Sequence, residues 1–551
     1  MKKIAIILTI VGCSFVSFAQ ENSGEIHGDF NLSLQSYQED VLIEAKAADE
    51  IVLNNAYLNI NYIKGNFRAG LRYESYLNAL ADYDTEFKGN GIPFRYATYS
   101  IDGLEITAGN YYEQLGSGLI FRSYEEKGLG IDNAMDGVRL KYMPIQGLYL
   151  KTFIGKSRTH FTYADGIFRG VDGELNINDI FGFQSKTKAI LGGSFVSRYH
   201  ERSNIMFKIP QNVSAYASRL NIMHKGWNYY GEFAYKINDP ANVLSESNMN
   251  YASGSAFTNS ITFSKRGFGF SVEMHRTDNM TFKSDRDKDG KAYLINYIPT
   301  LSKPHAYTLL ALYPCATQAD GEFGVQFDLY YKLKKGTLLG GKYGTKIDVN
   351  YSRINGLNSG SSFLNDNTEH TPMLISIVGE ELYFNDINIE IYKKLSKKTK
   401  LTVLFANQTY NKDFLEGHTP GDYGVLNSTI LISDISYKIK KGNTVRCELQ
   451  ILKSRQLEHA EELEEGDWSM GLLEYTISPN WFFAVQDMYN WGNENVDKQL
   501  HYINLSAGFI KGANRFEIGY GKKREGIFCV GGVCKLVPSS NGFSLSITSS
   551  F

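Results

Sequence analysis

The chain has 551 residues, a formal net charge of -2 and a mean hydropathy of -0.28. The hydropathy excludes a bundle of apolar transmembrane helices, and the balanced charge excludes the basic footprint of a nucleic-acid-binding protein. One globular core usually stops growing near about 250–300 residues, whereas a closed β-barrel grows by adding strands. The 37 Tyr and 33 Phe residues fit a barrel, because aromatic side chains favour strands and form girdles at membrane interfaces.

The N-terminus has the pattern of a secretory signal peptide over residues 1–19. Two lysines precede an apolar run over residues 4–18, and small residues then favour cleavage between Ala19 and Gln20. The run is too short for a spanning helix, which needs about 20 apolar residues. A lipoprotein signal is the alternative, because the segment that ends at Cys13 resembles a lipobox. The apolar run continues beyond that cysteine, which favours simple cleavage.

From residue 24 onward the chain consists of alternating segments of about 9–14 residues separated by turns, as in tilted membrane strands. In residues 67–74 the odd positions are apolar and the even positions are small or charged, and residues 326–333 and 515–520 repeat this pattern. Side chains on a strand point alternately to opposite faces. Each segment therefore has one face suited to lipid and one polar face.

Tight turns alternate with long polar stretches along the chain. The tight turns are at residues 64–66, 225–226, 265–267, 334–336, 440–443, 478–480 and 511–514, and the long stretches are near 78–93, 114–134, 157–187, 279–321, 353–380, 411–424, 454–467 and 523–540. A barrel threaded through an outer membrane has short periplasmic turns and long outward loops. A soluble β-sandwich is the alternative, but its strands are shorter.

We therefore predict an all-β fold: one transmembrane antiparallel β-barrel over residues 20–551, with no separate plug domain. Counting hairpins gives about 22 strands, with about 20 to 26 compatible with the pattern. Residues 157–210 hold either an extra hairpin or one long loop. An even number of strands keeps both termini on the periplasmic side.

The C-terminal segment, residues 542–551, has the most specific pattern. Phe543, Leu545, Ile547 and the terminal Phe551 share one face. A last strand of this kind resembles the signal read by the outer-membrane insertion machinery. We expect it to pair with the first strand, residues near Leu32 lying beside residues near Leu545, because an unpaired edge does not persist in hydrocarbon.

Four segments resemble an uncharacterised outer-membrane β-barrel family of Bacteroidota-type bacteria, over about the first 160 residues. They are GNFRAGLRYE (65–74), GNYYEQLGSGL (109–119), RSYEE (122–126) and DNAMDGV (132–138). The resemblance implies a barrel in the outer membrane of a Gram-negative bacterium. It implies no biochemical activity.

A set of charged residues falls on the polar face of the predicted strands: Arg68, Arg72, Glu74, Glu105, Arg139, Lys141, Glu232, Asp328, Glu390, Arg446, Glu448, Arg515 and Glu517. A hydrated lumen tolerates charges that a lipid-facing surface does not. They form either a ring that selects solutes or a ladder of ion pairs that braces the wall.

The segment from residue 114 to 136 is a candidate constriction loop that folds into the barrel. Gly116 and Gly118 allow sharp turns. Phe121 ends an apolar stretch that needs a packing partner, and the barrel interior is the nearest one. The charged residues that accompany it are Arg122, Glu125 and Glu126. Two strand extensions above the membrane are the alternative.

A calcium site and a disulfide are two further predictions. Asp285, Asp287 and Asp289 have the spacing of a calcium-binding loop. Asn296 replaces the usual bidentate Glu, so a solvated loop is the alternative, and no other cofactor is expected. Cys529 and Cys534 flank a Gly-rich turn in the last long loop, and an oxidising compartment favours a disulfide between them.

The sequence carries no sign of catalysis, because it contains neither a G-x-S-x-G elbow nor an H-E-x-x-H motif. Two hypotheses of function remain. The first is a passive channel or transporter for small solutes with a loop-constricted lumen, which predicts an open polar path. The second is a non-conducting structural or accessory subunit of an envelope or secretion assembly, which predicts a plugged lumen and exposed apolar loops. The expected partners are outer-membrane lipid, the barrel insertion machinery and, for the second hypothesis, other envelope proteins; no nucleic acid is expected.

Overall fold

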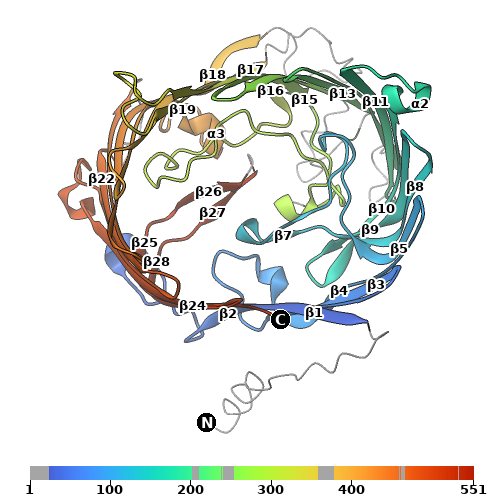
Figure 1. The fold of residues 1–551 in the computed structure, drawn as a ribbon. Coiled ribbons are helices and arrows are strands. Elements are labelled where there is room, and N and C mark those ends of the chain that lie inside the picture. Colours follow the sequence, from blue (N-terminus) through green and yellow to red (C-terminus); the bar gives the residue numbers. More distant parts are fainter. Residues whose placement is uncertain are drawn as a thin grey trace.

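The computed structural model describes residues 24–201, 210–237, 239, 253–288, 290–357, 378–457, 460, 466–530 and 533–551. Antiparallel strands form a closed 24-stranded barrel (Figure 1). This confirms the predicted transmembrane β-barrel, and the number of strands lies within the expected range. The predicted signal peptide, residues 1–19, lies outside the described residues.

The strands and helices have the following bounds. The barrel strands are β1 (Glu25–Gln35), β2 (Leu53–Lys64), β3 (Phe67–Tyr76), β4 (Gly89–Ile101), β5 (Leu104–Tyr111), β8 (Met135–Ile145), β9 (Leu148–Thr159), β10 (Thr162–Asn176), β11 (Thr187–Tyr199), β12 (Asn212–His224), β13 (Trp227–Lys236), β14 (Gly254–Lys265), β15 (Phe268–Asp278), β16 (Gly321–Leu333), β17 (Thr345–Leu357), β18 (Val378–Lys394), β19 (Thr399–Asn411), β20 (Val425–Lys440), β21 (Asn443–Gln456), β22 (Trp468–Ile477), β23 (Trp481–Tyr489), β24 (His501–Lys511), β25 (Asn514–Lys523) and β28 (Ser540–Ser550). The connections contain β6 (Glu125–Glu126), β7 (Ile131–Asp132), β26 (Gly526–Val530), β27 (Val533–Val537), α2 (Ile177–Phe181), α3 (Lys412–Glu416) and the 3-10 helices η1 (Val41–Ile43), η2 (Thr85–Phe87), η3 (Lys127–Leu129), η4 (Lys291–Tyr293) and η5 (Val496–Lys498).

The first and last strands close the barrel. Each barrel strand pairs with the next one along the chain, and β1 pairs with β28. Leu32 lies opposite Ile547, and Leu34 lies opposite Leu545. The predicted pairing of these two segments is confirmed, with a register two residues away from the pair expected from the sequence.

The outer face of the wall is apolar. Leu71, Val171 and Leu449 are among its many exposed aliphatic side chains, and such a band needs the hydrocarbon of a bilayer around it. Aromatic rings gather beside the tight turns, where Trp227 lies 4.7 Å from Phe263, centroid to centroid. They form a girdle at this membrane interface. Among the described residues no helix is long and apolar enough to cross a membrane.

The two rims of the barrel differ. The start of β1, the end of β28 and most tight turns lie at one rim, named here the short-turn end, and most long connections lie at the other, the long-loop end. The prediction of a long outward loop over residues 157–187 is wrong. Thr159 pairs with Thr162, so the chain turns directly from β9 into β10, and β10 and β11 form the extra hairpin that the sequence left open within residues 157–210. These strands read as polar because side chains such as Asp172 face the interior, where Arg219 pairs with it at 2.8 Å.

Several long connections fold into the barrel. In Figure 1, β7, the β26–β27 hairpin and α3 lie inside the ring of strands. Buried apolar side chains of the connections and of the inner wall form two large clusters and a small one. One large cluster contains residues of β5 and of β8 to β14, the other contains residues of β17 to β23, and the small cluster contains Tyr57, Tyr76 and Phe87. The core of this protein is therefore in the lumen.

Candidate functional site: the loop-packed lumen

The predicted lumen charges lie on the inner face of the wall. Leu71 and Tyr73 on the outer face are 38% and 40% exposed, whereas Arg72 and Glu74 between and beside them are 3% and 1% exposed. The same alternation places the other predicted charges inside: Arg68, Glu105, Arg139, Lys141, Glu232, Asp328, Glu390, Arg446, Glu448, Arg515 and Glu517. The strand period alone therefore located these side chains.

Part of this set forms a ladder of ion pairs along the wall. Glu105 accepts from Arg68 at 2.8 Å and from Arg139 at 3.0 Å. Glu113 lies at the start of the first inward connection, residues 112–134 between β5 and β8. Its carboxylate lies 3.4 Å from Nζ of Lys141 and 3.3 Å from Nζ of Lys151. Opposite charges from different strands meet here on the inner face, so these residues brace the wall.

Arg72 and Glu74 belong to a second, buried network that holds the inward connection. Arg158 pairs with Glu74 at 2.5 Å and also with Asp132, and Arg72 pairs with Glu125. Burial raises the pKa of the Glu125 carboxyl, although the Arg72 guanidinium opposes the shift. Arg72 and Glu74 thus lie under the connection, bracing it, and do not line an open path.

The predicted constriction loop lies inside the barrel. Phe121 is fully buried, and its ring lies 4.5 Å from that of Phe153 on the inner wall. Gly116 has a φ of 55°, and a Cβ there would lie 2.2 Å from a carboxylate oxygen of Glu232. That carboxylate accepts from the Ser117 amide at 2.8 Å. The close approach explains why glycine occupies position 116.

The other predicted residues of the constriction loop, Gly118, Arg122 and Glu126, also form specific contacts. Gly118 has a φ of 103°, and its carbonyl accepts from the Tyr297 amide at 3.0 Å. The Arg122 guanidinium lies 4.1 Å from the centre of the Tyr297 ring. Glu126 accepts from the Gly128 amide at 3.0 Å and caps η3. The first connection therefore packs on both the wall and a second connection, residues 279–320.

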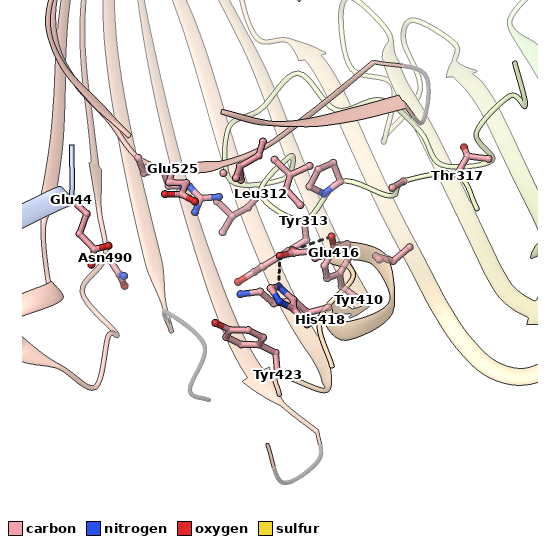
Figure 2. A pocket seen from close by; sticks show the side chains of 18 of the residues that line it. Glu44, Leu312, Tyr313, Thr317, Tyr410, Glu416, His418, Tyr423, Asn490 and Glu525 are labelled. Atoms are coloured by element: carbon pink, nitrogen blue, oxygen red, sulfur yellow. Dashed lines mark hydrogen bonds and ion pairs between the residues drawn. The ribbon is translucent and has the colours of Figure 1, made fainter. Parts of the chain in front are cut away.

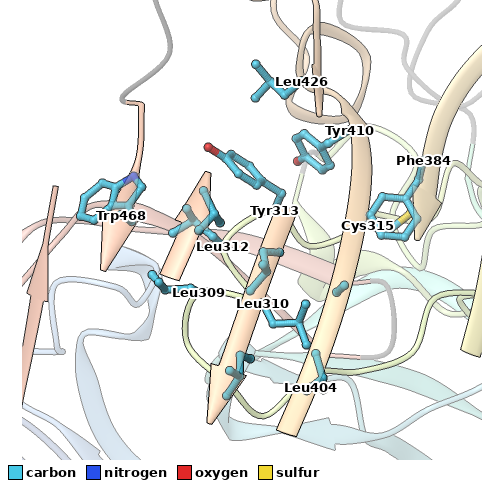
Figure 3. Close-up of a cluster of buried hydrophobic side chains, with 14 of the residues drawn as sticks. Leu309, Leu310, Leu312, Tyr313, Cys315, Phe384, Leu404, Tyr410, Leu426 and Trp468 are labelled. Carbon is cyan, nitrogen blue, oxygen red and sulfur yellow. The ribbon is translucent and has the colours of Figure 1, made fainter. Parts of the chain in front are cut away.

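The prediction that residues 279–321 form an outward polar loop is wrong. Leu309, Leu310, Leu312 and Tyr313 are buried against the wall (Figure 3). The Leu309 amide donates to Oε1 of Gln450 at 2.8 Å. The sequence could have predicted this burial, because several apolar residues close together in a loop usually pack against another part of the protein.

A third inward connection, residues 411–424, is closed by one carboxylate. The amides of Gly421, Tyr423 and Gly424 donate to Asp413 at 2.7, 2.7 and 3.0 Å. Burial favours the protonated form of this carboxyl, but the three donors outweigh it and hold the pKa of Asp413 below its usual value. Asp413 therefore stabilises the loop as a carboxylate.

The last inward connection contains the predicted disulfide. In the β26–β27 hairpin the backbone of Cys529 lies directly opposite that of Cys534. Opposed residues of antiparallel strands have Cα atoms about 4.5–5.5 Å apart, within the range of disulfides. The side chains of both cysteines lie outside the described part of the chain, so the disulfide remains a prediction.

The inward connections line an open cavity of about 1140 Å³ at the long-loop end. Its lining is mixed: tyrosines and amides alternate with ionic and aliphatic groups, among them Tyr297, Tyr313, Tyr410, Tyr423, Tyr502, Asn296, Gln318, Asn490, Lys412, Lys498, Glu44, Glu416, Ile298 and Leu312. Glu416 accepts from the Tyr410 hydroxyl at 3.1 Å and lies 3.3 Å from Nε2 of His418 (Figure 2). Such a lining suits a polar solute with an apolar face.

The predicted calcium ligands are only partly brought together. The Asp287 amide donates to Asp285 at 3.0 Å, Asp285 is buried, and Asp289 lies outside the described residues. Arg286 between them donates to the carbonyl of Pro210 at 2.7 Å. Calcium binding here remains a prediction.

The residues predicted as the insertion signal lie on the outer face of the last strand. Phe543 and Phe551 are 54% and 62% exposed, and Leu545 and Ile547 share their face and are partly exposed. The Phe543 ring lies 4.6 Å from that of Tyr520. Recognition by the insertion machinery remains a prediction.

Solved structures of similar fold are large outer-membrane barrels. A chain of the E. coli P pilus tip assembly intermediate PapC-PapD-PapK-PapG matches at 10% identity and a TM-score of 0.49, over 97% of this chain and 62% of that chain. The siderophore receptor PirA of Pseudomonas aeruginosa matches at 9% and 0.41, over 97% and 81%. A BenF-like porin of Pseudomonas fluorescens Pf-5 matches at 10% and 0.35, over 79% and 99%. At these identities the likeness concerns the fold alone.

A family model matches the chain by sequence. The family described as "Family of unknown function (DUF6029)" covers residues 1–551. No curated protein matches the chain.

Proposed function

The chain belongs to the DUF6029 family of unknown function. We propose that this member of the family passes a small polar solute across the outer membrane of a Gram-negative bacterium. The lumen is the path, and the inward connections restrict it. The closed barrel with its apolar outer face supports the membrane placement. The long-loop end faces outward, and the short-turn end faces the periplasm.

The cavity at the long-loop end is the observation that carries this proposal. Its volume of about 1140 Å³ exceeds what one amino acid or monosaccharide needs. Tyrosine rings, amides and both signs of charge line it, so it offers hydrogen bonds to a solute without attracting one sign of ion. Residues 294–298 and 312–319 form part of its lining and also pack on the inner wall.

This arrangement gives a route with a gate. A solute enters the cavity from outside and meets the segment that contains Leu312 and Tyr313. Because that segment is held by apolar contacts and a few hydrogen bonds, a modest displacement opens the lumen beneath it. The flow expected is therefore slow and selective, unlike that of a wide general pore.

Liposome swelling tests the proposal. Purified protein in liposomes is exposed to isosmotic arabinose, glucose, sucrose and raffinose, and empty liposomes serve as the control. We expect swelling with the smaller sugars and a sharp loss as size increases. Swelling with none of these sugars, nor with glycine or lysine, would contradict solute passage.

A second candidate function has its own supporting observation. Apolar side chains are exposed on the loops of the long-loop end: Val41 is 78%, Ile51 89% and Val496 74% exposed. Together with the packed lumen, this fits a non-conducting barrel that binds another envelope protein. A photo-crosslinking residue at Ile51 would then capture a single partner in intact cells. The same residue at Leu338, which is 97% exposed near the short-turn end, is the control.

A further inference from the structure

Three ligand-type side chains meet outside the cavity, where the wall touches the second inward connection. One ligand atom each from Asp165, His200 and Asp285 lie within 4.8 Å of one another. Asp165 belongs to β10, His200 follows β11, and Asp285 belongs to residues 279–320. Only the folded barrel brings these three parts of the chain together.

The backbone of β10 near Gly166 allows residues 283–285 of the second inward connection to approach it closely. The register of β9 and β10 shifts between Tyr163 and Ile167, and such a bulge redirects the side chains within it. A Cβ on Gly166 would lie 2.3 Å from the carbonyl oxygen of Ser284. Arg198 donates to the carbonyl of Lys283 at 2.6 Å. The connection is therefore docked against the bulge one residue before Asp285.

Among the described residues, the His200 ring has no hydrogen-bond partner. The residue is 3% exposed, and its Nδ1 is buried and unpaired. Its Nε2 lies 3.8 Å from Oδ1 of Asp285, which is beyond hydrogen-bond length. Buried imidazoles are normally hydrogen-bonded. The unpaired ring and the gap between Nε2 and the Asp285 carboxylate leave room for a ligand that binds both.

The neighbouring cations are engaged elsewhere. Arg198 pairs with Asp239 at 2.6 Å, and Arg286 lies 3.5 Å from the same carboxylate. Within the described part of the chain, neither Asp165 nor Asp285 forms an ion pair with a lysine or arginine.

We propose that Asp165, His200 and Asp285 bind a divalent transition-metal ion of the Zn²⁺ type, with water in a fourth position. One imidazole nitrogen and two carboxylate oxygens suit such an ion. By binding side chains from both, the ion crosslinks residues 279–320 to β10 and to the residue that follows β11. This site differs from the calcium loop suggested by the sequence, because it uses Asp285 without Asp287. It also goes beyond solute passage, since the ion controls how firmly the lumenal segment is held.

Metal binding to the purified full-length barrel tests the site. Protein freed of metal with EDTA is titrated with Zn²⁺, and Co²⁺ is added separately to read the coordination from its visible absorption. The variants are His200→Ala and Asp165→Asn, and Asp287→Asn is the matched control from the same loop. Migration of unheated samples in SDS gels shows that each barrel is folded.

We expect one Zn²⁺ per chain, a rise in the unfolding temperature, and tetrahedral Co²⁺ bands. Affinity should fall at least about tenfold in His200→Ala and Asp165→Asn, and stay unchanged in Asp287→Asn. Asp165 is exposed, so its variant decides the matter if His200→Ala does not fold. Equal binding by wild type and Asp165→Asn, or loss of binding only in Asp287→Asn, overturns the proposal. Solute passage is measured separately and does not depend on this result.

Discussion

The Gly28 amide donates to the carbonyl of Phe551 at 2.9 Å, and the Phe551 amide donates back to the carbonyl of Gly28 at the same distance. The phenyl ring also covers Gly28, because a Cβ on that glycine would lie 2.4 Å from Cζ of the ring. A glycine on one edge strand and a terminal aromatic on the other thus complete the seam on the lipid side. The pairing leaves no free edge in hydrocarbon.

Gly28→Ala is expected to destabilise the folded barrel by about 1–3 kcal/mol. The new methyl group meets the phenyl ring and also the backbone carbonyl of Asn59, 2.7 Å away, which has no freedom to move. Gly193→Ala is the control, since its nearest neighbour is the Ala217 carbonyl at 3.9 Å; it should change stability by less than about 1 kcal/mol. Urea unfolding in lipid vesicles measures both. Equal effects would show that the seam is not tightly packed.

Arg158→Ala should cost about 3–5 kcal/mol, because it removes one of the two guanidinium groups that pair with the buried Glu74 and Asp132 and leaves both carboxylates with Arg72 alone. Arg515→Ala removes an ion pair with Glu517 whose side chains are 50% and 33% exposed, and should cost less than about 1 kcal/mol. Hydrogen exchange of residues 112–134 reports the loss directly. Unchanged protection in Arg158→Ala would contradict the bracing role.

Acid should loosen residues 411–424. The pKa of Asp413 is lowered in the folded state, so the carboxylate contributes stability above its unfolded pKa of about 3.9, and this contribution is lost as pH falls through the lower folded value. Limited proteolysis between about pH 6 and pH 2 should therefore show cleavage rising at the acid end. In Asp413→Asn, cleavage should be raised already at pH 6 and change little with pH. A wild-type loop that resists cleavage throughout would refute the role of Asp413.

Thiol counting tests the predicted disulfide. Cys315 and Cys447 are free, so denatured mature protein should react at these two residues alone before reduction. After reduction, Cys529 and Cys534 should react as well. Their reaction without reduction would rule out the bond.

The sequence predicted the strands of the barrel wall better than the connections that fold into the lumen. The two-residue period located Arg72, Glu74 and the other inward charges, and the terminal pattern identified the strands that close the barrel. Loop conformation has no such period. The apolar stretch ending at Phe121 correctly predicts inward folding, whereas Leu309, Leu310 and Leu312 form a similar apolar stretch in a segment predicted to be an outward loop. His200 was not predicted because its partners are 35 and 85 residues away along the chain.

Single-channel conductance in a planar bilayer tests the central claim, that the inward connections restrict a path through the lumen. The decisive variant replaces residues 304–313 with a short Gly-Ser linker, which removes Leu309, Leu312 and Tyr313 from the wall. Wild-type protein should give small, brief openings, and the variant should give large and lasting ones while it still migrates as a folded barrel. If the folded variant conducts no more than wild type, the lumen is not a solute path, and the non-conducting role replaces the one proposed.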